Sequence, residues 1–156
     1  MNYLVIINAS GKTAHLNNEH INSMAGVIQA YAEEKNIATE KILFLTAPTL
    51  SVRNVVDPIA RILNVKPLEN EALWGGDGHV TNQARFHDVV QNGSTAEMKV
   101  VFTNGEYPTR FPGYYGATHG FSTNVEGAME PFDVVFINVK EKTWTKSSVL
   151  ATATAQ

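Results

Sequence analysis

Two short apolar runs, each followed by an asparagine, constrain the fold of this sequence more than any other feature. Residues 3–7 lead into Asn8, and residues 99–102 lead into Thr103 and Asn104. Runs of β-branched and aromatic residues are typical of strands buried on both faces of a parallel sheet. Ligands bind beyond the carboxyl ends of such strands, so we expect Asn8 and Asn104 to face a binding site.

Helical and strand patterns alternate along the chain, which favours a three-layer α/β/α domain with a mostly parallel sheet. Apolar residues at helical spacing predict helices at residues 18–35 and 52–63, the second kinked or divided at Pro58. The expected strands are residues 3–7, 41–46, 100–102 and 134–137, with a weaker edge strand at residues 143–151. Residues 66–82 are expected to be irregular, and Thr81 is expected to cap a short helix that ends at Asn92.

Composition places the chain among ordinary globular proteins. It has 156 residues, of which 44% are hydrophobic and 17% charged, so we expect one domain across residues 1–156 with a single core. The net charge is −3 and the basic residues are scattered, whereas a nucleic-acid-binding surface needs a basic stripe. We therefore expect no nucleic-acid partner.

The chain contains no cysteine, which excludes disulfides, thiolate metal sites and a cysteine nucleophile. Its first apolar run has no basic leader and is too short for a signal peptide or a membrane span. We therefore expect a cytoplasmic protein with no membrane partner.

The order of these segments resembles the histidine phosphatase superfamily, which includes the phosphoglycerate mutases. In that family a first strand ends in Arg-His-Gly, a second runs into Ser-x-x-x-Arg-Ala-x-x-Thr-Ala, and a late strand ends in His-Gly. Residues 5–9, 43–60 and 101–105 take these three places here. The resemblance covers roughly the first two thirds of the chain and implies a phosphoglycerate mutase-like fold.

The resemblance also places the two catalytic histidines of the family on asparagines. The nucleophilic histidine corresponds to Asn8, the arginine before it to Ile7, and the second histidine to Asn104. A carboxamide nitrogen cannot accept a phosphoryl group, because its lone pair is delocalised into the carbonyl. The resemblance therefore implies a non-catalytic domain with degenerate motifs. Asparagine after a strand is also an ordinary turn residue, which is the alternative explanation.

The charged groups of the family site are altered as well. Its second phosphate-binding arginine corresponds to Ser51, with Arg53 two positions further on, and its acid to Glu69 or Glu71. The resemblance thus implies a small anionic or phosphorylated ligand, or a protein partner, and neither cofactor nor metal. The expected ligand-binding residues are Asn8, Ser10, Ser51, Arg53, Glu71 and Asn104.

Other histidines offer an alternative chemistry. Thr118-His119-Gly120 spells the second family motif, but residues 111–117 are rich in glycine and proline and make a poor strand. We therefore expect an aromatic-rich loop there, and a hydrolase that uses His119 or His79 with Glu71 is the alternative function. Asp77, His79 and His87 match no compact metal site, because their spacing lacks the helical i, i+4 pairing of zinc helices.

A second family gives another alternative. Residues 5–13 are similar to the start of flavodoxin-like reductases, where a serine-rich loop after the first strand holds the flavin phosphate at a helix N-terminus. Ser10, Gly11, Lys12 and Thr13 match that loop in part. This resemblance would imply bound flavin mononucleotide.

Overall fold

Six strands form one sheet, and the element bounds locate every side chain discussed below. The strands are β1 (Tyr3–Asn8), β2 (Ile42–Thr46), β3 (Pro67–Glu69), β4 (Met98–Thr103), β5 (Asp133–Asn138) and β6 (Thr143–Ser148). The computed structural model of the chain describes residues 1–9, 18–75, 81–123 and 129–149. Ser10 and His79 lie outside these residues.

The spatial order of the strands is β3-β2-β4-β1-β5-β6. The first four are mutually parallel, while β5 runs antiparallel to both β1 and β6. The expected mostly parallel sheet is therefore confirmed. In the flavodoxin-like order the first strand lies between the second and third, whereas here β1 lies between β4 and β5, so the strand order does not support the flavodoxin-like alternative.

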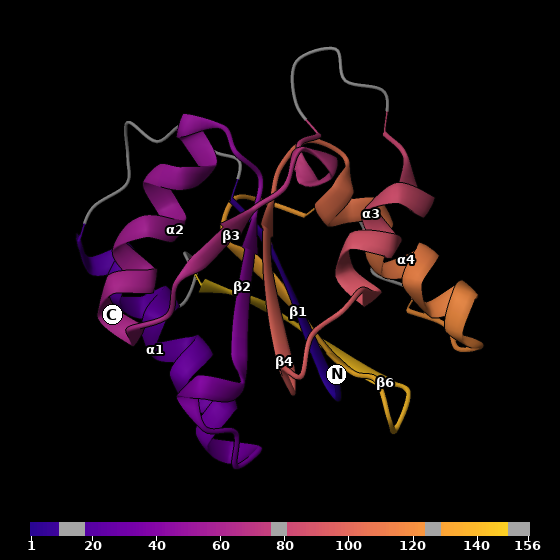
Figure 1. Cartoon of the computed structure of the whole chain (residues 1–156), viewed down its shortest axis with the longest axis horizontal. Helices are drawn as coiled ribbons and strands as arrows, with labels where there is room; N and C mark the ends of the chain where they lie inside the picture. Colours follow the sequence, from indigo (N-terminus) through magenta and orange to yellow (C-terminus); the bar gives the residue numbers. More distant parts are fainter. Residues whose placement is uncertain (10–17, 76–80, 124–128, 150–156) are drawn as a thin grey trace.

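Helices cover both faces of the sheet, which confirms the three layers (Figure 1). The helices are α1 (Asn18–Glu34), α2 (Leu50–Leu63), α3 (Gln83–Gln91) and α4 (Tyr107–His119), with short 3₁₀ turns η2 (Thr39–Lys41) and η3 (Glu71–Leu73). The first two pack together on one face, and α3 and α4 lie on the other (Figure 1).

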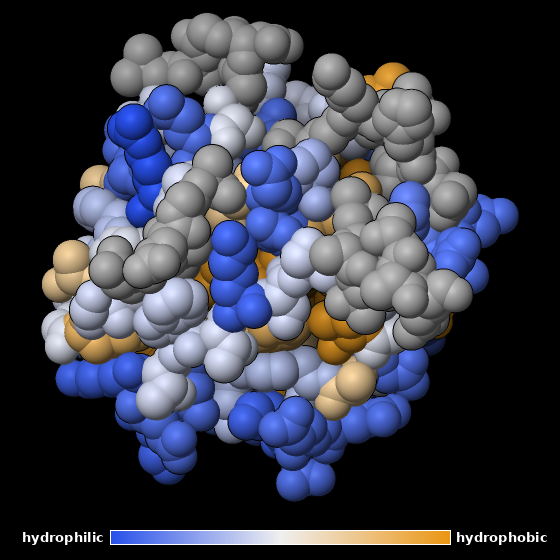
Figure 2. Space-filling view, turned by 180° about the vertical axis from the view of Figure 1, so that it is seen from behind, coloured by the Kyte–Doolittle hydropathy of each residue, from blue (hydrophilic) through white to orange (hydrophobic). Residues whose placement is uncertain are grey.

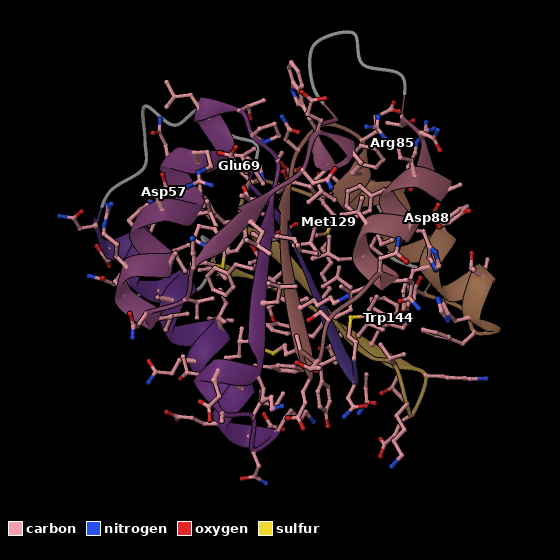
Figure 3. All side chains as sticks on the ribbon, in the orientation of Figure 1. Asp57, Glu69, Arg85, Asp88, Met129 and Trp144 are labelled. Carbon is pink, nitrogen blue, oxygen red and sulfur yellow. The ribbon has the colours of Figure 1, made fainter. Side chains whose placement is uncertain are left out.

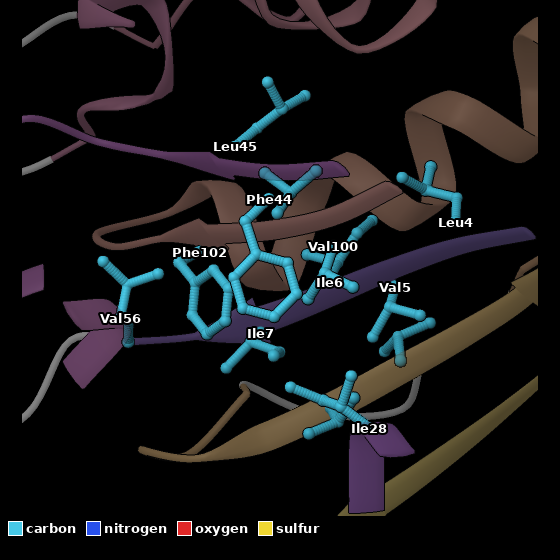
Figure 4. Packing of buried hydrophobic residues seen from close by; sticks show 14 of the residues in the cluster. Leu4, Val5, Ile6, Ile7, Ile28, Phe44, Leu45, Val56, Val100 and Phe102 are labelled. Carbon is cyan, nitrogen blue, oxygen red and sulfur yellow. The ribbon is translucent and has the colours of Figure 1, made fainter. Parts of the chain in front are cut away.

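The core between the sheet and its first two helices is aromatic and aliphatic. Phe44 and Phe102 come from neighbouring strands, and their ring centroids are 5.1 Å apart. Figure 4 shows these rings beside Ile7, with Ile28 of α1 and Val56 of α2 closing the cluster. All five side chains are buried, and so is every residue of β4, so this uninterrupted apolar run does mark a strand covered on both faces.

Residues 50–63 form one helix with Pro58 inside it, not two short helices. The helix ends at Asn64, which adopts the left-handed conformation with φ 57°. Burial of Val52, Val55 and Ile59 along one face offsets the hydrogen bond that Pro58 removes.

The first part of the segment expected to be irregular is ordered, because β3 and η3 lie within residues 67–73. The cap of α3 is Asn82, one residue after the expected Thr81. Its side-chain oxygen accepts a hydrogen bond of 3.0 Å from the backbone N–H of Arg85. Asn82 directly precedes the first helical residue, where a side chain reaches the third N–H of the helix.

The expected aromatic loop after Asn104 is wrong, because residues 107–119 form helix α4. Tyr107, Phe111 and Tyr115 recur every four residues and are buried on one face of this helix. Their burial outweighs the poor helix propensity of the prolines and glycines between them. The spacing of these three aromatic residues was the signal for a helix.

The last strand lies at the edge of the sheet, as expected, and most of its residues are exposed. Lys146 on this strand is 3.6 Å from the carboxylate of Asp133 on β5.

The face in Figure 2 is largely hydrophilic, with hydrophobic residues visible in small patches. Within the described residues, no helix combines the length and the apolar character needed to cross a bilayer.

Candidate functional site

Buried polar side chains gather where the parallel strands end. We call this set the polar edge; its members are Asn8, Thr46, Thr103, Asn104 and Asp133, all buried. Asp133 belongs to it because β5 runs antiparallel to β1, which brings the first residue of β5 to the end of β1. Ligands of open parallel sheets bind at this edge, so the polar edge is the candidate site.

Asn8 fixes a chain segment across the end of β1. Its side-chain amide donates a hydrogen bond of 2.7 Å to the backbone carbonyl of Met129. The backbone carbonyl of Asn8 accepts a second hydrogen bond, of 2.8 Å, from the backbone N–H of Phe132. The side chain is only 4% exposed. The carboxamide thus works as a buried anchor for residues 129–132.

Asn104 has the corresponding role at the end of β4. Its side-chain oxygen accepts a hydrogen bond of 2.9 Å from the backbone N–H of Gly75, and it is 8% exposed. The neighbouring hydroxyl of Thr103 donates to the carbonyl of Leu73 at 2.5 Å. The end of β4 is therefore joined to the segment that follows η3.

Two glycines let these backbones touch. A Cβ atom on Gly105 would lie 1.8 Å from the carbonyl oxygen of Gly75, and Gly105 has a φ of 68°. A Cβ atom on Gly75 would lie 2.5 Å from the carbonyl oxygen of Asn104. Because the opposing atoms belong to the backbone, no side chain can move aside, and glycine is required at both positions.

The first turn of α4 adds two more hydrogen bonds to those made by Asn8, Thr103 and Asn104. Thr109 accepts a hydrogen bond of 2.9 Å from the backbone N–H of Met129, and the hydroxyl of Tyr107 accepts one of 2.8 Å from Asn82. Helix α4 thereby holds the segments that precede β5 and α3. The polar edge is a hydrogen-bonded junction of several chain segments.

Asp133 is the charged member of the polar edge. One carboxylate oxygen accepts a hydrogen bond of 2.8 Å from the N–H of Glu130 and lies 3.6 Å from the ammonium group of Lys146. The other oxygen is buried and has no hydrogen-bond partner within the described part of the chain. A buried polar atom of this kind needs an explanation, such as a ligand donor.

Arg53 is bound by two carboxylates. Its guanidinium is 2.7 Å from Asp57 and 3.2 Å from Glu69, so it joins α2 to the end of β3; Figure 3 labels both acids. It also lines a depression of about 500 Å³ with Arg61 and Lys66. Strand β3 lies three places from β1, about 14 Å away at ~4.8 Å per strand, so a ligand touching both Arg53 and Asn8 would have to span that distance.

Two other expected site residues are exposed. Ser51 lies in the first turn of α2, where its hydroxyl is 3.4 Å from that of Thr49. Glu71 begins η3. The described structure makes neither residue part of the buried polar edge.

His119 does not reach the polar edge. It is the last residue of α4, which starts at that edge, so it lies about 18 Å along the helix at 1.5 Å per residue. Its Nε2 atom is 2.9 Å from the Nε2 atom of His87 on α3. This pair was not predicted, because residues 107–119 were expected to form a loop. His119 continues the four-residue spacing of Tyr107, Phe111 and Tyr115, which was the available signal.

Comparison with known proteins supports the fold. The sequence matches no protein-family model and no curated protein sequence. The structure is similar to phosphoglycerate mutase from Plasmodium falciparum, with a TM-score of 0.52 and 8% identity over 93% of this chain and 87% of that one. It is also similar to a protein from Agrobacterium tumefaciens described as a phosphohistidine phosphatase, SixA, with a TM-score of 0.51 and 8% identity over 92% of each chain. The chain therefore has a phosphoglycerate mutase-like α/β fold.

Proposed function

We propose that this chain is a histidine phosphatase-like domain that lacks phosphohistidine catalysis and binds a small polar or weakly held anionic ligand at its polar edge. The observation that carries the proposal is the carboxamide of Asn8, which directly ends β1 and donates to the carbonyl of Met129. An amide in this position holds a neighbour, but its nitrogen lone pair is delocalised into the carbonyl and does not attack phosphorus.

The charges of Arg53 and Asp133 favour a polar ligand over a tightly bound phosphate. Arg53 already contacts two carboxylates, and Asp133 adds a buried carboxylate to the edge. Tight phosphate recognition relies on arginine side chains that bind the anion in a bidentate manner. The Asp133 oxygen that has no hydrogen-bond partner among the described residues would accept a hydrogen bond from a ligand hydroxyl or amine.

The catalytic half of the proposal is tested by incubating the protein with a generic aryl phosphate and by looking for an acid-labile phosphoprotein. We expect no turnover above a heat-treated control and no phosphoprotein, because both asparagine positions lack an imidazole nitrogen. Asn8→Ala and Asn104→Ala serve as matched variants. Turnover that disappears in either variant would refute the proposal, whereas turnover retained in both would place the chemistry on other residues.

The binding half is tested by thermal unfolding with phosphate, sulfate, a sugar phosphate or a neutral polyol. We expect the anions to raise the Tm only at millimolar concentration, since stabilisation follows the ratio of ligand concentration to Kd. Asp133→Asn removes the charge at the polar edge, and exposed Glu40→Gln is its matched control. Micromolar binding of phosphate, or saturable binding of flavin mononucleotide, would contradict the proposal.

A further inference from the structure

The pair formed by His87 and His119 lies outside the polar edge and is not used by the proposed function. His87 comes from the middle of α3 and His119 from the end of α4, and their Nε2 atoms are 2.9 Å apart. Both side chains are partly exposed. Neutral imidazole is the commonest protein ligand for transition metals.

We propose that His87 and His119 form a two-histidine binding site for a divalent transition-metal ion, with copper and nickel as the best fit. No group of three or more histidine, aspartate or glutamate side chains suited to a metal is found among the described residues. Among the described residues the site therefore has two ligands, and we expect water to complete the coordination.

Aromatic neighbours hold both rings in place. Tyr115 stacks on His119 with a centroid distance of 4.1 Å and an interplanar angle of 25°. The ring centroid of His87 lies 5.7 Å from that of Tyr115 and 6.1 Å from that of Tyr114, so both tyrosines pack against the pair. Because both histidines sit on packed helices, little conformational freedom remains to be lost when a metal binds.

The 2.9 Å separation of the two nitrogens is that of a hydrogen bond between the rings, so a bound metal would take the place of the shared proton. With metal–nitrogen bonds of about 2.05 Å, nitrogens 2.9 Å apart subtend an angle of about 90° at the metal. A tetrahedral angle would require a separation of about 3.3 Å at the same bond length. A right angle is the angle between adjacent ligands in the square-planar and tetragonal geometries of Cu²⁺ and Ni²⁺.

A nearby positive charge limits the strength of binding. The ammonium group of Lys142 lies 3.8 Å from the position that a Cβ atom of Gly120, the residue after His119, would take. The same Lys142 ammonium group repels an incoming cation. We therefore expect a micromolar Kd in the native protein and tighter binding in Lys142→Gln.

The experiment uses full-length protein without a histidine tag, stripped of metal and titrated with Cu²⁺ or Ni²⁺ alone. We expect one equivalent of metal to bind, a raised Tm, and a Cu²⁺ electron paramagnetic resonance spectrum with coupling to two nitrogens. His87→Ala and His119→Ala should each weaken binding at least tenfold, and His20→Ala on α1 is the matched control. Circular dichroism verifies that each variant is folded.

Several results would overturn the site. The site would be refuted if the native protein bound no metal at a tenfold excess of Cu²⁺. It would also be refuted if the double variant His87→Ala, His119→Ala bound Cu²⁺ with the same affinity as the native protein. If the alanine variants fail to fold, a native Cu²⁺ spectrum without coupling to two nitrogens decides against the site. None of these measurements depends on the polar edge, so failure here leaves the proposed function untouched.

Discussion

At the scale of single residues, Asn8 and Asn104 each make a hydrogen bond that a backbone group would otherwise lack. The sequence could place both residues at strand ends, because the apolar runs before them are unambiguous. It could not identify their partners, since Met129 lies 121 positions from Asn8 and no local pattern relates the two. The same holds for Arg53, whose partner Glu69 comes from another element.

Removing the Asn8 carboxamide should destabilise the protein. Asn8→Ala leaves the buried carbonyl of Met129 without this donor, and an unsatisfied buried polar group costs about 1–3 kcal/mol. Urea unfolding measures the loss. The control is Asn138→Ala, which removes an exposed hydrogen bond to Glu141 and should cost less than about 0.5 kcal/mol. Equal losses in the two variants would contradict the anchoring role.

His119 makes stability depend on pH. Burial and its neighbours lower its pKa in the folded state, so the unfolded state binds the proton more tightly. The contribution is therefore complete above the unfolded pKa of about 6.5 and is lost as the pH falls from there through the folded value. In chelator-containing buffer, we expect the free energy of unfolding to fall from pH 7.5 to 5.5, and less steeply in His119→Gln. An unchanged slope in that variant would assign the effect to other groups.

At the scale of elements, sequence patterns served well for strands and poorly for α4. Strands β1, β2, β4 and β5 lie within one or two residues of their expected bounds, because β-branched runs have few alternatives. Helix α4 was missed because proline and glycine are poor helix formers, and only packing against α3 and the sheet reverses that preference. Short β3 carries too few residues to show any period.

Buried Lys99 on β4 caps helix α3. Its ammonium group donates to the carbonyls of Val90 at 2.5 Å and Asn92 at 3.3 Å, although burial lowers its pKa. Lys99→Met keeps the length of the side chain but leaves those carbonyls unpaired, so we expect a loss of about 1–3 kcal/mol in urea unfolding. Exposed Lys41→Met is the control. A more stable Lys99→Met protein would show that burying the charge costs more than the caps contribute.

The contact between Gly75 and Gly105 gives a sharper test of the junction. Gly105→Ala should cost more than about 2 kcal/mol, because an alanine in the left-handed region costs about 1–2 kcal/mol and the Cβ atom also meets the carbonyl of Gly75. Gly93→Ala is the matched control, since Gly93 also has a positive φ, 49°, but nothing within 4 Å of its Cβ position. Thermal unfolding of both variants isolates the contribution of the contact. Equal losses would mean that the backbones are not in close contact.

At the scale of the whole molecule, alternation of helices and strands was enough to predict a layered, mostly parallel fold. The reversed direction of β5 was not predictable, because an apolar run looks the same in either direction.

We expect one cooperative domain. Trp74 follows η3 and Trp144 lies on β6, so Trp74→Phe and Trp144→Phe each leave one fluorescent probe. Urea transitions from the two variants and from far-ultraviolet circular dichroism should coincide in shape, and clearly separate transitions would show two domains.

The central place of β1 also has a consequence during synthesis. Strand β1 is synthesised before both of its partners, since Tyr3 pairs with Met98 on one side and with Asn138 on the other. Until β4 and β5 have emerged from the ribosome, β1 therefore presents two unpaired apolar edges, the kind of surface that aggregates or recruits chaperones. Long separations of this kind also slow folding, because a large loop must close before the contacts form. Folding of this sheet during synthesis should thus wait for β5 to emerge and then proceed around β1.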